Sequence, residues 1–298
     1  MRIALIGAGR MGRPIASRLL DAGHALTVFD SAPEPVREIV RAGAAAGASG
    51  AAAVGDVELT LVSLPTPAVV EEVVLGSDGV LTACPGGSVL ADLSTGPPTL
   101  ARRMADAGRE RGIAVLDTPV SGGPLGAAAG TLAVMVGGDP EGFARARPVL
   151  EAFGTTVRRL GGPGAGQATK LANNLLAAAQ MAALGEAVAL ARAEGIDPAQ
   201  MYEAIAGASG DSSVLRQRFP VPGVLERAPA SHDWAALFPV DLLVKDVSLA
   251  LAAASDHALA LPVAERALER YAEAQDRGWG ALDYSAVARL HGNAELSG

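Results

Sequence analysis

The sequence is short of metal-binding and disulfide-forming residues. Cys84 is the only cysteine, so neither a disulfide framework nor a thiolate metal site can form within one chain. The four histidines are far apart in sequence and show no spacing typical of metal ligands. We therefore expect no bound metal and a reducing compartment, the cytoplasm.

Positive charge is also scarce. The chain has 24 lysine and arginine residues against 32 aspartate and glutamate residues, which gives a formal net charge of -8. Nucleic acids and anionic membranes are bound by clustered basic residues, and here these residues are scattered. The first apolar run is too short for a secretory signal, and no stretch looks like an uninterrupted membrane span. We expect no nucleic-acid partner and no membrane.

Aromatic residues make up only 3% of the chain, although 50% of it is hydrophobic, so the core must consist mainly of alanine, valine and leucine. A length of 298 residues suits two domains better than one core. The first half alternates β-rich runs with helical segments, which predicts a parallel sheet covered by helices. The predicted strands are RIALIG, ALTVFD, ELTLVSLP, SVLADLS and IAVLDTP.

The second half has a different pattern. From Ala165 to Glu194 the sequence is almost wholly helix-forming and rich in alanine and leucine. A helix of about thirty residues would be about 45 Å long. Further helices follow without a convincing strand, so we expect an α/β half and an α half.

The strongest single motif is the glycine-rich turn in IALIGAGRMGRPIASRLL. Gly7, Gly9 and Gly12 have the spacing G-x-G-x-x-G, directly after an apolar strand and at the start of an amphipathic helix. In a dinucleotide-binding turn, these glycines permit the tight bend, the approach of a pyrophosphate and close packing of helix against strand. A purely structural turn is the weaker alternative, because the next strand ends on the acidic Asp30.

Asp30 bears on the choice of dinucleotide. A carboxylate here can accept hydrogen bonds from the adenosine ribose, whereas a 2'-phosphate about 4 Å away would be repelled by about 4 kcal/mol per unit charge. No arginine follows Asp30 before Arg37. We therefore expect NAD, with NADP as the alternative.

Two later segments carry polar groups suited to a substrate. In LDTPVSGGPLGAAAGTL, Ser121, Gly122 and Gly123 would present a hydroxyl and two unhindered amides, a natural cradle for a carboxylate. A glycine turn leading into a strand is an equal alternative. In GAGQATKLANNLL, Lys170 and Asn174 are four residues apart and share one helix face, while the intervening Asn173 would point away.

Lys170 stands where the helix dipole disfavours a positive charge. The dipole, desolvation and a neighbouring cationic nicotinamide would lower the pKa of this lysine towards neutrality, as a general acid/base requires. From this segment alone, a lysine reaching from the helix end into solvent remains the alternative.

In this order, GAGRMGRPIA, DTPVSGGPLGAAAGTL and GAGQATKLANN resemble the β-hydroxyacid dehydrogenase family, which includes 3-hydroxyisobutyrate dehydrogenase, tartronate semialdehyde reductase and relatives of 6-phosphogluconate dehydrogenase. The resemblance runs over nearly the whole chain. It implies an NAD(P)-binding Rossmann domain, residues 1–163, joined by a long interdomain helix to an all-α substrate and dimerisation domain, residues 164–298. It also implies a homodimer or homotetramer.

The resemblance also implies the roles of individual residues. Lys170 would be the catalytic acid/base, Asn174 would orient the substrate, and Ser121, Gly122 and Gly123 would hold its carboxylate. The implied cofactor-binding residues are Gly7, Gly9, Arg10, Met11, Gly12, Asp30, Leu64, Pro65, Ser94, Thr95, Phe238 and Lys245.

Three further segments carry this resemblance. VSLPTPAVVEEVVLG looks like the family's cofactor loop around Leu64 and Pro65, and DLSTGPP looks like the segment that brings Ser94 and Thr95 towards the nicotinamide ribose. The segment FPVDLLVKDVSLAL looks like a segment that the family has late in its sequence, with the pattern F-x(3)-L-x-x-K-D. Phe238, Lys245 and Asp246 match this pattern.

The implied activity is NAD-dependent oxidation of a short β-hydroxy acid, 3-hydroxyisobutyrate-like, to its semialdehyde by hydride transfer. QRFPVPGVLERAP is similar to a P-V-P-G stretch of 3-hydroxyisobutyrate dehydrogenases. One alternative is an NADPH-dependent reductase of a small semialdehyde, such as tartronate, glyoxylate or succinic semialdehyde. A non-catalytic dinucleotide-binding protein and a flavin or methyl-donor enzyme are weaker alternatives. Imine reductases share the architecture but generally lack the catalytic lysine.

Overall fold

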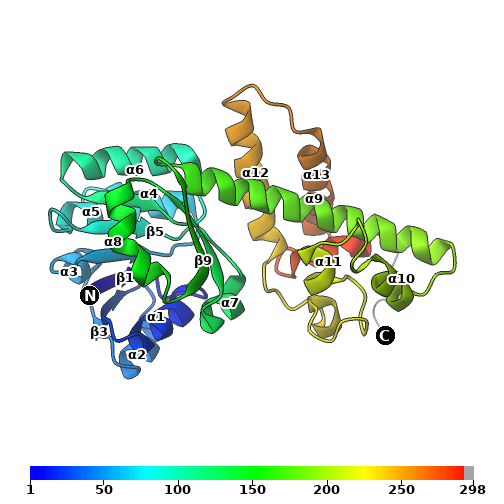
Figure 1. Ribbon diagram of the computed structural model, residues 1–298, viewed down its shortest axis with the longest axis horizontal. Coiled ribbons are helices and arrows are strands. Elements are labelled where there is room, and N and C mark those ends of the chain that lie inside the picture. Colours follow the sequence, from blue (N-terminus) through cyan, green and yellow to red (C-terminus); the bar gives the residue numbers. More distant parts are fainter. Residues whose placement is uncertain (292–298) are drawn as a thin grey trace. The chain divides into compact units, whose positions relative to one another are not determined.

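The computed structural model describes residues 1–291 (Figure 1). The chain forms two compact units, Met1–Lys170 and Leu171–Gly298. Helix α9 (Ala165–Ala193) contains residues of both units, and it matches the long helix predicted from the sequence.

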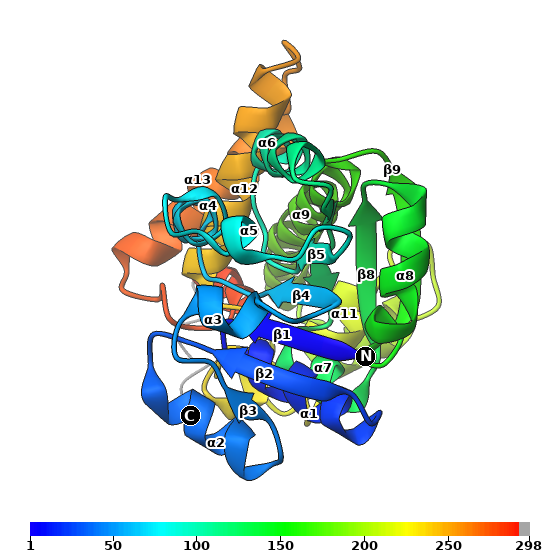
Figure 2. The ribbon, with the colours of Figure 1, turned by 90° about the vertical axis from the view of Figure 1, so that its left-hand side faces the viewer.

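The first unit is built on a sheet with the strand order β3-β2-β1-β4-β5-β6-β8-β7, and β9 pairs with β8 (Figure 2). The strands are β1 (Arg2–Ile6), β2 (Ala25–Phe29), β3 (Ala45–Ala46), β4 (Leu59–Val62), β5 (Val89–Asp92), β6 (Ala114–Asp117), β7 (Val120–Ser121), β8 (Leu132–Gly137) and β9 (Gly154–Gly161). Strands β1 to β6 pair with one another in parallel, whereas β8 runs antiparallel to β6 and β7. The strand order reverses at β1, where doubly wound sheets bind their ligands.

The predicted Rossmann-type architecture is confirmed, and all five predicted strands are present as β1, β2, β4, β5 and β6. The sequence pattern did not reveal β3, β7 or β9. Strand β9 pairs with β8 alone, and both Arg158 and Arg159 on it are exposed. Charged residues are common on such edge strands, where they discourage pairing with other chains, and they also mask the alternating pattern by which a strand is predicted.

Helices cover this sheet. They are α1 (Gly12–Asp21), α2 (Pro33–Arg41), α3 (Gly50–Val54), α4 (Pro67–Leu75), α5 (Val80–Ala83), α6 (Pro98–Glu110), α7 (Gly123–Ala129) and α8 (Pro140–Leu150). Helix α3 is capped by Ser49, whose hydroxyl accepts a hydrogen bond of 3.0 Å from the Ala52 N–H. Such caps satisfy backbone donors that the first turn of a helix leaves unpaired.

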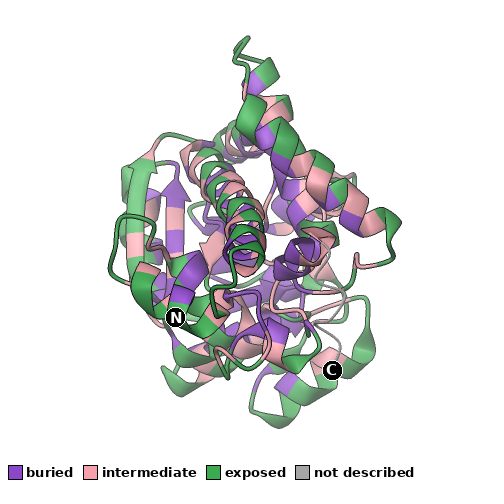
Figure 3. Cartoon of the chain, turned by 90° about the vertical axis from the view of Figure 1, so that its right-hand side faces the viewer, coloured by how far each residue is buried: buried purple, intermediate pink, exposed green. Residues whose placement is uncertain are grey.

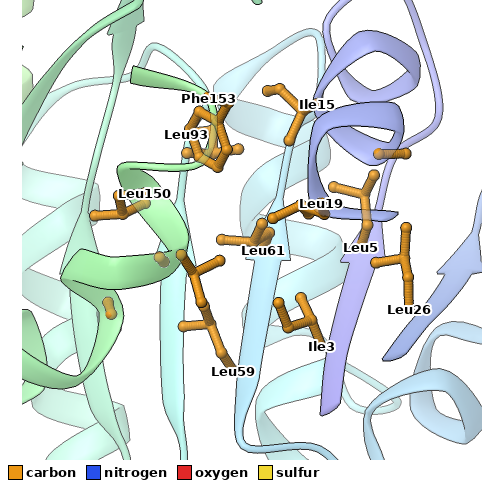
Figure 4. Close-up of a cluster of buried hydrophobic side chains, with 14 of the residues drawn as sticks. Ile3, Leu5, Ile15, Leu19, Leu26, Leu59, Leu61, Leu93, Leu150 and Phe153 are labelled. Carbon is orange, nitrogen blue, oxygen red and sulfur yellow. The ribbon is translucent and has the colours of Figure 1, made fainter. Parts of the chain in front are cut away.

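Alternate residues of the strands pack into two separate hydrophobic clusters. Ile3, Leu5, Leu59 and Leu61 belong to one cluster, in which Phe153 is also fully buried (Figure 4). Ala4, Ile6 and Val62 of the same strands belong to the other cluster. Successive side chains of a strand point to opposite faces of a sheet, so both faces are covered, as a parallel sheet requires.

The second unit is helical. Besides most of α9, it contains α10 (Pro198–Ile205), α11 (Ser213–Arg218), α12 (Val240–Ser255), α13 (Pro262–Asp276) and the 3-10 helices η1 (Pro229–His232) and η2 (Tyr284–His291). Between Ala165 and His291, the only β-type pairing is an isolated bridge between Pro239 and Asp283. The burial pattern along the chain is shown in Figure 3.

From the sequence we expect no stretch that looks like an uninterrupted membrane span, and α9 corrects this expectation. By length and composition alone, α9 is long and apolar enough to cross a membrane. The core helix of a soluble protein passes the same test, and the buried residues Ala178, Met181 and Val188 of α9 join the core of the helical unit. The packing therefore accounts for much of the apolar character of this helix.

A buried ion pair organises the helical unit. The Asp283 carboxylate is fully buried, pairs with the Arg218 guanidinium at 2.5 Å, and accepts hydrogen bonds from the N–H groups of Leu237 and Phe238. The guanidinium also lies 4.8 Å from the ring centroid of Tyr284. Removing one partner of a buried pair costs about 3 to 5 kcal/mol, because the other charge is left without compensation. The P-V-P-G segment that follows Arg218 is thereby tied to the start of α12.

Tyr284 gives the folded protein a sensitivity to alkali. Burial raises the pKa of its phenol from 10.0 to about 12. Because the unfolded chain then ionises first, the free energy of unfolding falls as the pH rises from 10 to 12. In urea unfolding at pH 9 and 11, the wild type should lose about 1 kcal/mol more than Tyr284→Phe. Equal losses in the two proteins would show that the phenol is not held neutral by the fold.

Candidate active site

The glycine turn between β1 and α1 has the close approaches that the motif predicts. Gly7 has φ +102°, and a Cβ there would lie 2.1 Å from the Ser63 carbonyl oxygen. A Cβ on Gly12 would lie 2.0 Å from the carbonyl oxygen of Gly7. At Gly9, by contrast, a Cβ would meet no heavy atom within 4 Å. The protein's own packing therefore requires Gly7 and Gly12, whereas the open backbone at Gly9 fits the approach of a pyrophosphate.

Asp30, directly after β2, is tied to this turn. Its carboxylate accepts hydrogen bonds from the Ala8 N–H at 2.6 Å and the Ala32 N–H at 2.8 Å. The exposed Arg37 guanidinium pairs with Glu34 at 2.8 Å. The next arginine along the chain after Asp30 is therefore paired with a neighbouring carboxylate.

The remaining residues of the predicted turn lie at its outer side. Arg10 is exposed, and Met11 is half-buried immediately before α1. Both residues therefore lie next to the open backbone of Gly9.

Two predicted cofactor segments are joined at the ends of neighbouring parallel strands. Leu64 and Pro65 follow β4, and Ser94 and Thr95 follow β5. The Leu64 N–H donates to the Ser94 hydroxyl at 2.9 Å, and the Ser94 N–H donates to the buried Asp92 carboxylate at 2.9 Å. These contacts hold the two turns side by side.

The predicted carboxylate cradle lies at the junction of β7 and α7. Ser121 is half-buried and ends β7, while Gly122 and Gly123 have φ of +132° and +64°. Positive φ at two successive residues is a conformation that glycine adopts without strain. The segment therefore places the Ser121 hydroxyl next to two successive glycines at the start of α7.

The start of α9 is fastened to the end of β6 by a buried carboxylate. The Asp117 side chain accepts hydrogen bonds of 2.8 Å from the N–H groups of both Gly164 and Gln167. Burial raises the pKa of Asp117 above its usual value, and these hydrogen bonds oppose the increase. A Cβ on Gly166 would lie 2.3 Å from the Met135 carbonyl oxygen, so glycine is needed for this close approach.

Lys170 follows one turn later in α9 and is only 8% exposed. The sequence contains 24 lysine and arginine residues, and only Lys170 and Lys245 are lysines. Arginine stays charged in proteins, whereas a buried lysine can exchange its proton near neutral pH. Neither lysine is highly exposed, since the Lys245 side chain is 24% exposed.

Within the helical unit, a second buried carboxylate gathers predicted site residues. Asp246 accepts a hydrogen bond of 2.5 Å from the Asn174 side-chain amide, and Lys245 Nζ lies 3.1 Å from its other oxygen. Asn173 was expected to point away, yet its amide donates to the Asn174 side-chain oxygen at 3.0 Å. An ionised carboxylate only accepts hydrogen bonds, so the nitrogen of the Asn174 amide, and not its oxygen, faces Asp246.

Phe238 is placed by the ion-pair network of the helical unit. Its N–H donates to Asp283 at 3.0 Å, and its ring packs edge-on against Tyr284 with centroids 6.0 Å apart. The half-buried ring therefore has a fixed position just before α12.

The sequence-based predictions missed the roles of Asp117 and Gln167 and assigned no role to Asp246. Asp117 ends a strand, and Gln167 stands one turn before Lys170, but neither position reveals a partner distant in sequence. Within residues 1–291, no group of three histidine, cysteine, aspartate or glutamate side chains is placed to hold a metal ion.

Family comparisons match both halves of the chain. Residues 2–162 match the NAD binding domain of 6-phosphogluconate dehydrogenase, and residues 164–291 match the family described as NAD-binding of NADP-dependent 3-hydroxyisobutyrate dehydrogenase.

Individual relatives extend over nearly the full length. The chain is 42% identical to the NAD-dependent L-serine dehydrogenase of Pseudomonas aeruginosa, with 97% of each chain covered. It is also 42% identical to the 3-hydroxyisobutyrate dehydrogenase of that organism, with 97% of this chain and 98% of the relative covered. The chain also resembles the solved structure of Mycobacterium tuberculosis 3-hydroxyisobutyrate dehydrogenase with L-serine, with a TM-score of 0.91 and 37% sequence identity. The match covers 97% of this chain and 98% of the solved one.

Proposed function

Because the chain belongs to the β-hydroxyacid dehydrogenase family, we propose that it catalyses the NAD-dependent oxidation of a short, 3-hydroxyisobutyrate-like β-hydroxy acid to its semialdehyde by hydride transfer. The observation that carries the proposal is the low exposure of both Lys170 and Asn174 on α9, at 8% and 4%. Burying a lysine and an asparagine in a helix is costly compared with burying alanine, and their use in a reaction explains why alanine does not stand at these two positions.

The substrate class follows from what the relatives have in common. L-Serine and 3-hydroxyisobutyrate, which the relatives' names contain, both have a primary alcohol β to a carboxylate. They differ at the intervening carbon, which bears an ammonium group in serine and a methyl group in 3-hydroxyisobutyrate. We assign the shared carboxylate to the Ser121 hydroxyl and the N–H groups of Gly122 and Gly123.

The cofactor-binding residues fit a nicotinamide dinucleotide, which supplies the ring that accepts the hydride. We assign its pyrophosphate to the open backbone at Gly9, in the turn that includes Gly7, Arg10, Met11 and Gly12. Further assigned cofactor residues are Asp30, Leu64, Pro65, Ser94, Thr95, Phe238 and Lys245. The Asp30 carboxylate would bind the adenosine ribose, and NADP is the alternative cofactor.

In the proposed reaction, Lys170 in its neutral form takes the proton of the substrate hydroxyl while the carbon-bound hydrogen leaves with its electron pair. In the reverse direction, the protonated lysine returns that proton to the new alkoxide oxygen. Asn174, oriented by Asp246, holds the substrate in line. Such positioning can lower the barrier by several kcal/mol, on the order of the effects measured for oriented reactants.

We also propose residues 1–163 as the dinucleotide-binding domain and residues 164–298 as the substrate and dimerisation domain of a cytoplasmic homodimer or homotetramer. Leu176 and Leu190 on α9 are 58% and 66% exposed. A subunit interface would remove such apolar surface from water.

Replacing Lys170 tests its role. Lys170→Ala should lower turnover by at least about a hundredfold, the usual scale for loss of a general acid/base, and should leave NADH binding and the melting temperature unchanged. Lys245→Ala, the matched change at the other lysine, should mainly raise the KM for NAD. Turnover of Lys170→Ala near that of the wild type would refute the assignment.

A substrate panel tests the proposed activity. NADH absorbance should increase with 3-hydroxyisobutyrate or L-serine and NAD, and much less with 4-hydroxybutyrate, whose alcohol is one carbon farther from the carboxylate. Glycerate, threonate and NADP complete the panel. Turnover only in the direction of semialdehyde reduction with NADPH would establish the alternative reductase, and the absence of any turnover would indicate a non-catalytic dinucleotide-binding protein.

A further inference from the structure

We propose that Gln167 is a positioning residue, whose side-chain amide locks the turn of residues 94–96 to the first turn of α9. The lock would fix Lys170 relative to the turn that bears Ser94 and Thr95. This inference rests on the proposed function, because that function places Lys170 at the reacting hydroxyl and Ser94 at the cofactor.

Both ends of the Gln167 amide bind the backbone of one turn. Its Nε2 donates to the Ser94 carbonyl oxygen at 2.8 Å, and its Oε1 accepts from the Gly96 N–H at 3.0 Å. Only one orientation of the amide satisfies both partners, since a carbonyl oxygen needs a donor and an N–H needs an acceptor. Gln167 is 1% exposed, so water cannot readily replace these contacts.

The locked turn is connected to the strand ends. The Ser94 hydroxyl accepts from the Leu64 N–H, and the Ser94 N–H donates to Asp92. The turns after β4 and β5 are therefore held together before Gln167 connects them to α9. A shift of the helix start would disturb both turns.

The helix side of the lock is equally constrained. The Gln167 N–H donates to Asp117 at the end of β6, so the backbone and the side chain of Gln167 bind different elements. Lys170 lies three residues later, at a rise of about 4.5 Å along α9. A misplacement of a catalytic group by about 1 Å can cost about a hundredfold in rate. The first turn of α9 is thus held from β4, β5 and β6 together.

A purely structural glutamine would be expected to affect stability alone. Gln167→Met removes both side-chain hydrogen bonds and keeps a similar length. In the cofactor-free protein, amide hydrogen exchange of residues 94–96 should become at least tenfold faster. Turnover should fall at least tenfold under conditions in which the variant remains folded.

Gln167→Glu separates positioning from packing. The new carboxyl can accept from the Gly96 N–H, but it can donate to the Ser94 carbonyl oxygen only when protonated. The ratio of its turnover to that of the wild type should therefore rise as the pH falls. This measurement also remains available if Gln167→Met fails to fold. Gln180→Glu, at an exposed position of α9, is the matched control and should keep a constant ratio.

The outcomes are distinct. Unchanged exchange at residues 94–96 in Gln167→Met would overturn the lock. Turnover of that variant within twofold of the wild type, or a ratio for Gln167→Glu that does not change with pH, would overturn the positioning role. If the wild type oxidises no hydroxy acid, the proposed function fails and the positioning role fails with it, while the exchange measurement still decides whether the lock exists.

Discussion

The structure depends on how the first turn of α9 is held. The Asp117 carboxylate, only 2% exposed, accepts the N–H groups of Gly164 and Gln167 and joins the helix to the end of β6. A buried carboxylate is costly unless its oxygens are satisfied, which explains why burial raises the pKa of Asp117 and why backbone donors oppose the increase. Lys170 lies on the next turn, so its position follows from this contact.

The chain uses buried aspartates repeatedly to place polar groups within a core of small aliphatic residues. Asp246 orients Asn174 in the helical unit, and Asp283 holds Arg218 and the backbone before α12. An ionised carboxylate only accepts hydrogen bonds, so it determines the orientation of every donor around it. With few aromatic side chains available to define a unique packing, such acceptors specify where the chemically important groups lie.

Much of the fold could be predicted because it depends on local patterns. The alternation of strands and helices, the glycine turn and the long helix are each encoded within a short stretch of sequence. Strand β9 could not be predicted, because its exposed arginines hide the pairing with β8. The contacts of Gln167 with Ser94 and Gly96 join residues distant in the sequence, and composition does not reveal such pairs. The sequence pattern did not single out α9 as long and apolar enough to cross a membrane, because polar residues at its start interrupt the apolar run.

The most direct test of the central claim is chemical rescue of Lys170→Ala by small primary amines. If the lysine acts as the acid/base at a fixed position, added amines should restore part of the turnover, and the restored rate should increase with amine basicity among amines of similar size. Lys245→Ala should gain nothing from the same amines. Restored rates independent of basicity, or no restoration by any amine small enough to replace the lost side chain, would contradict the account.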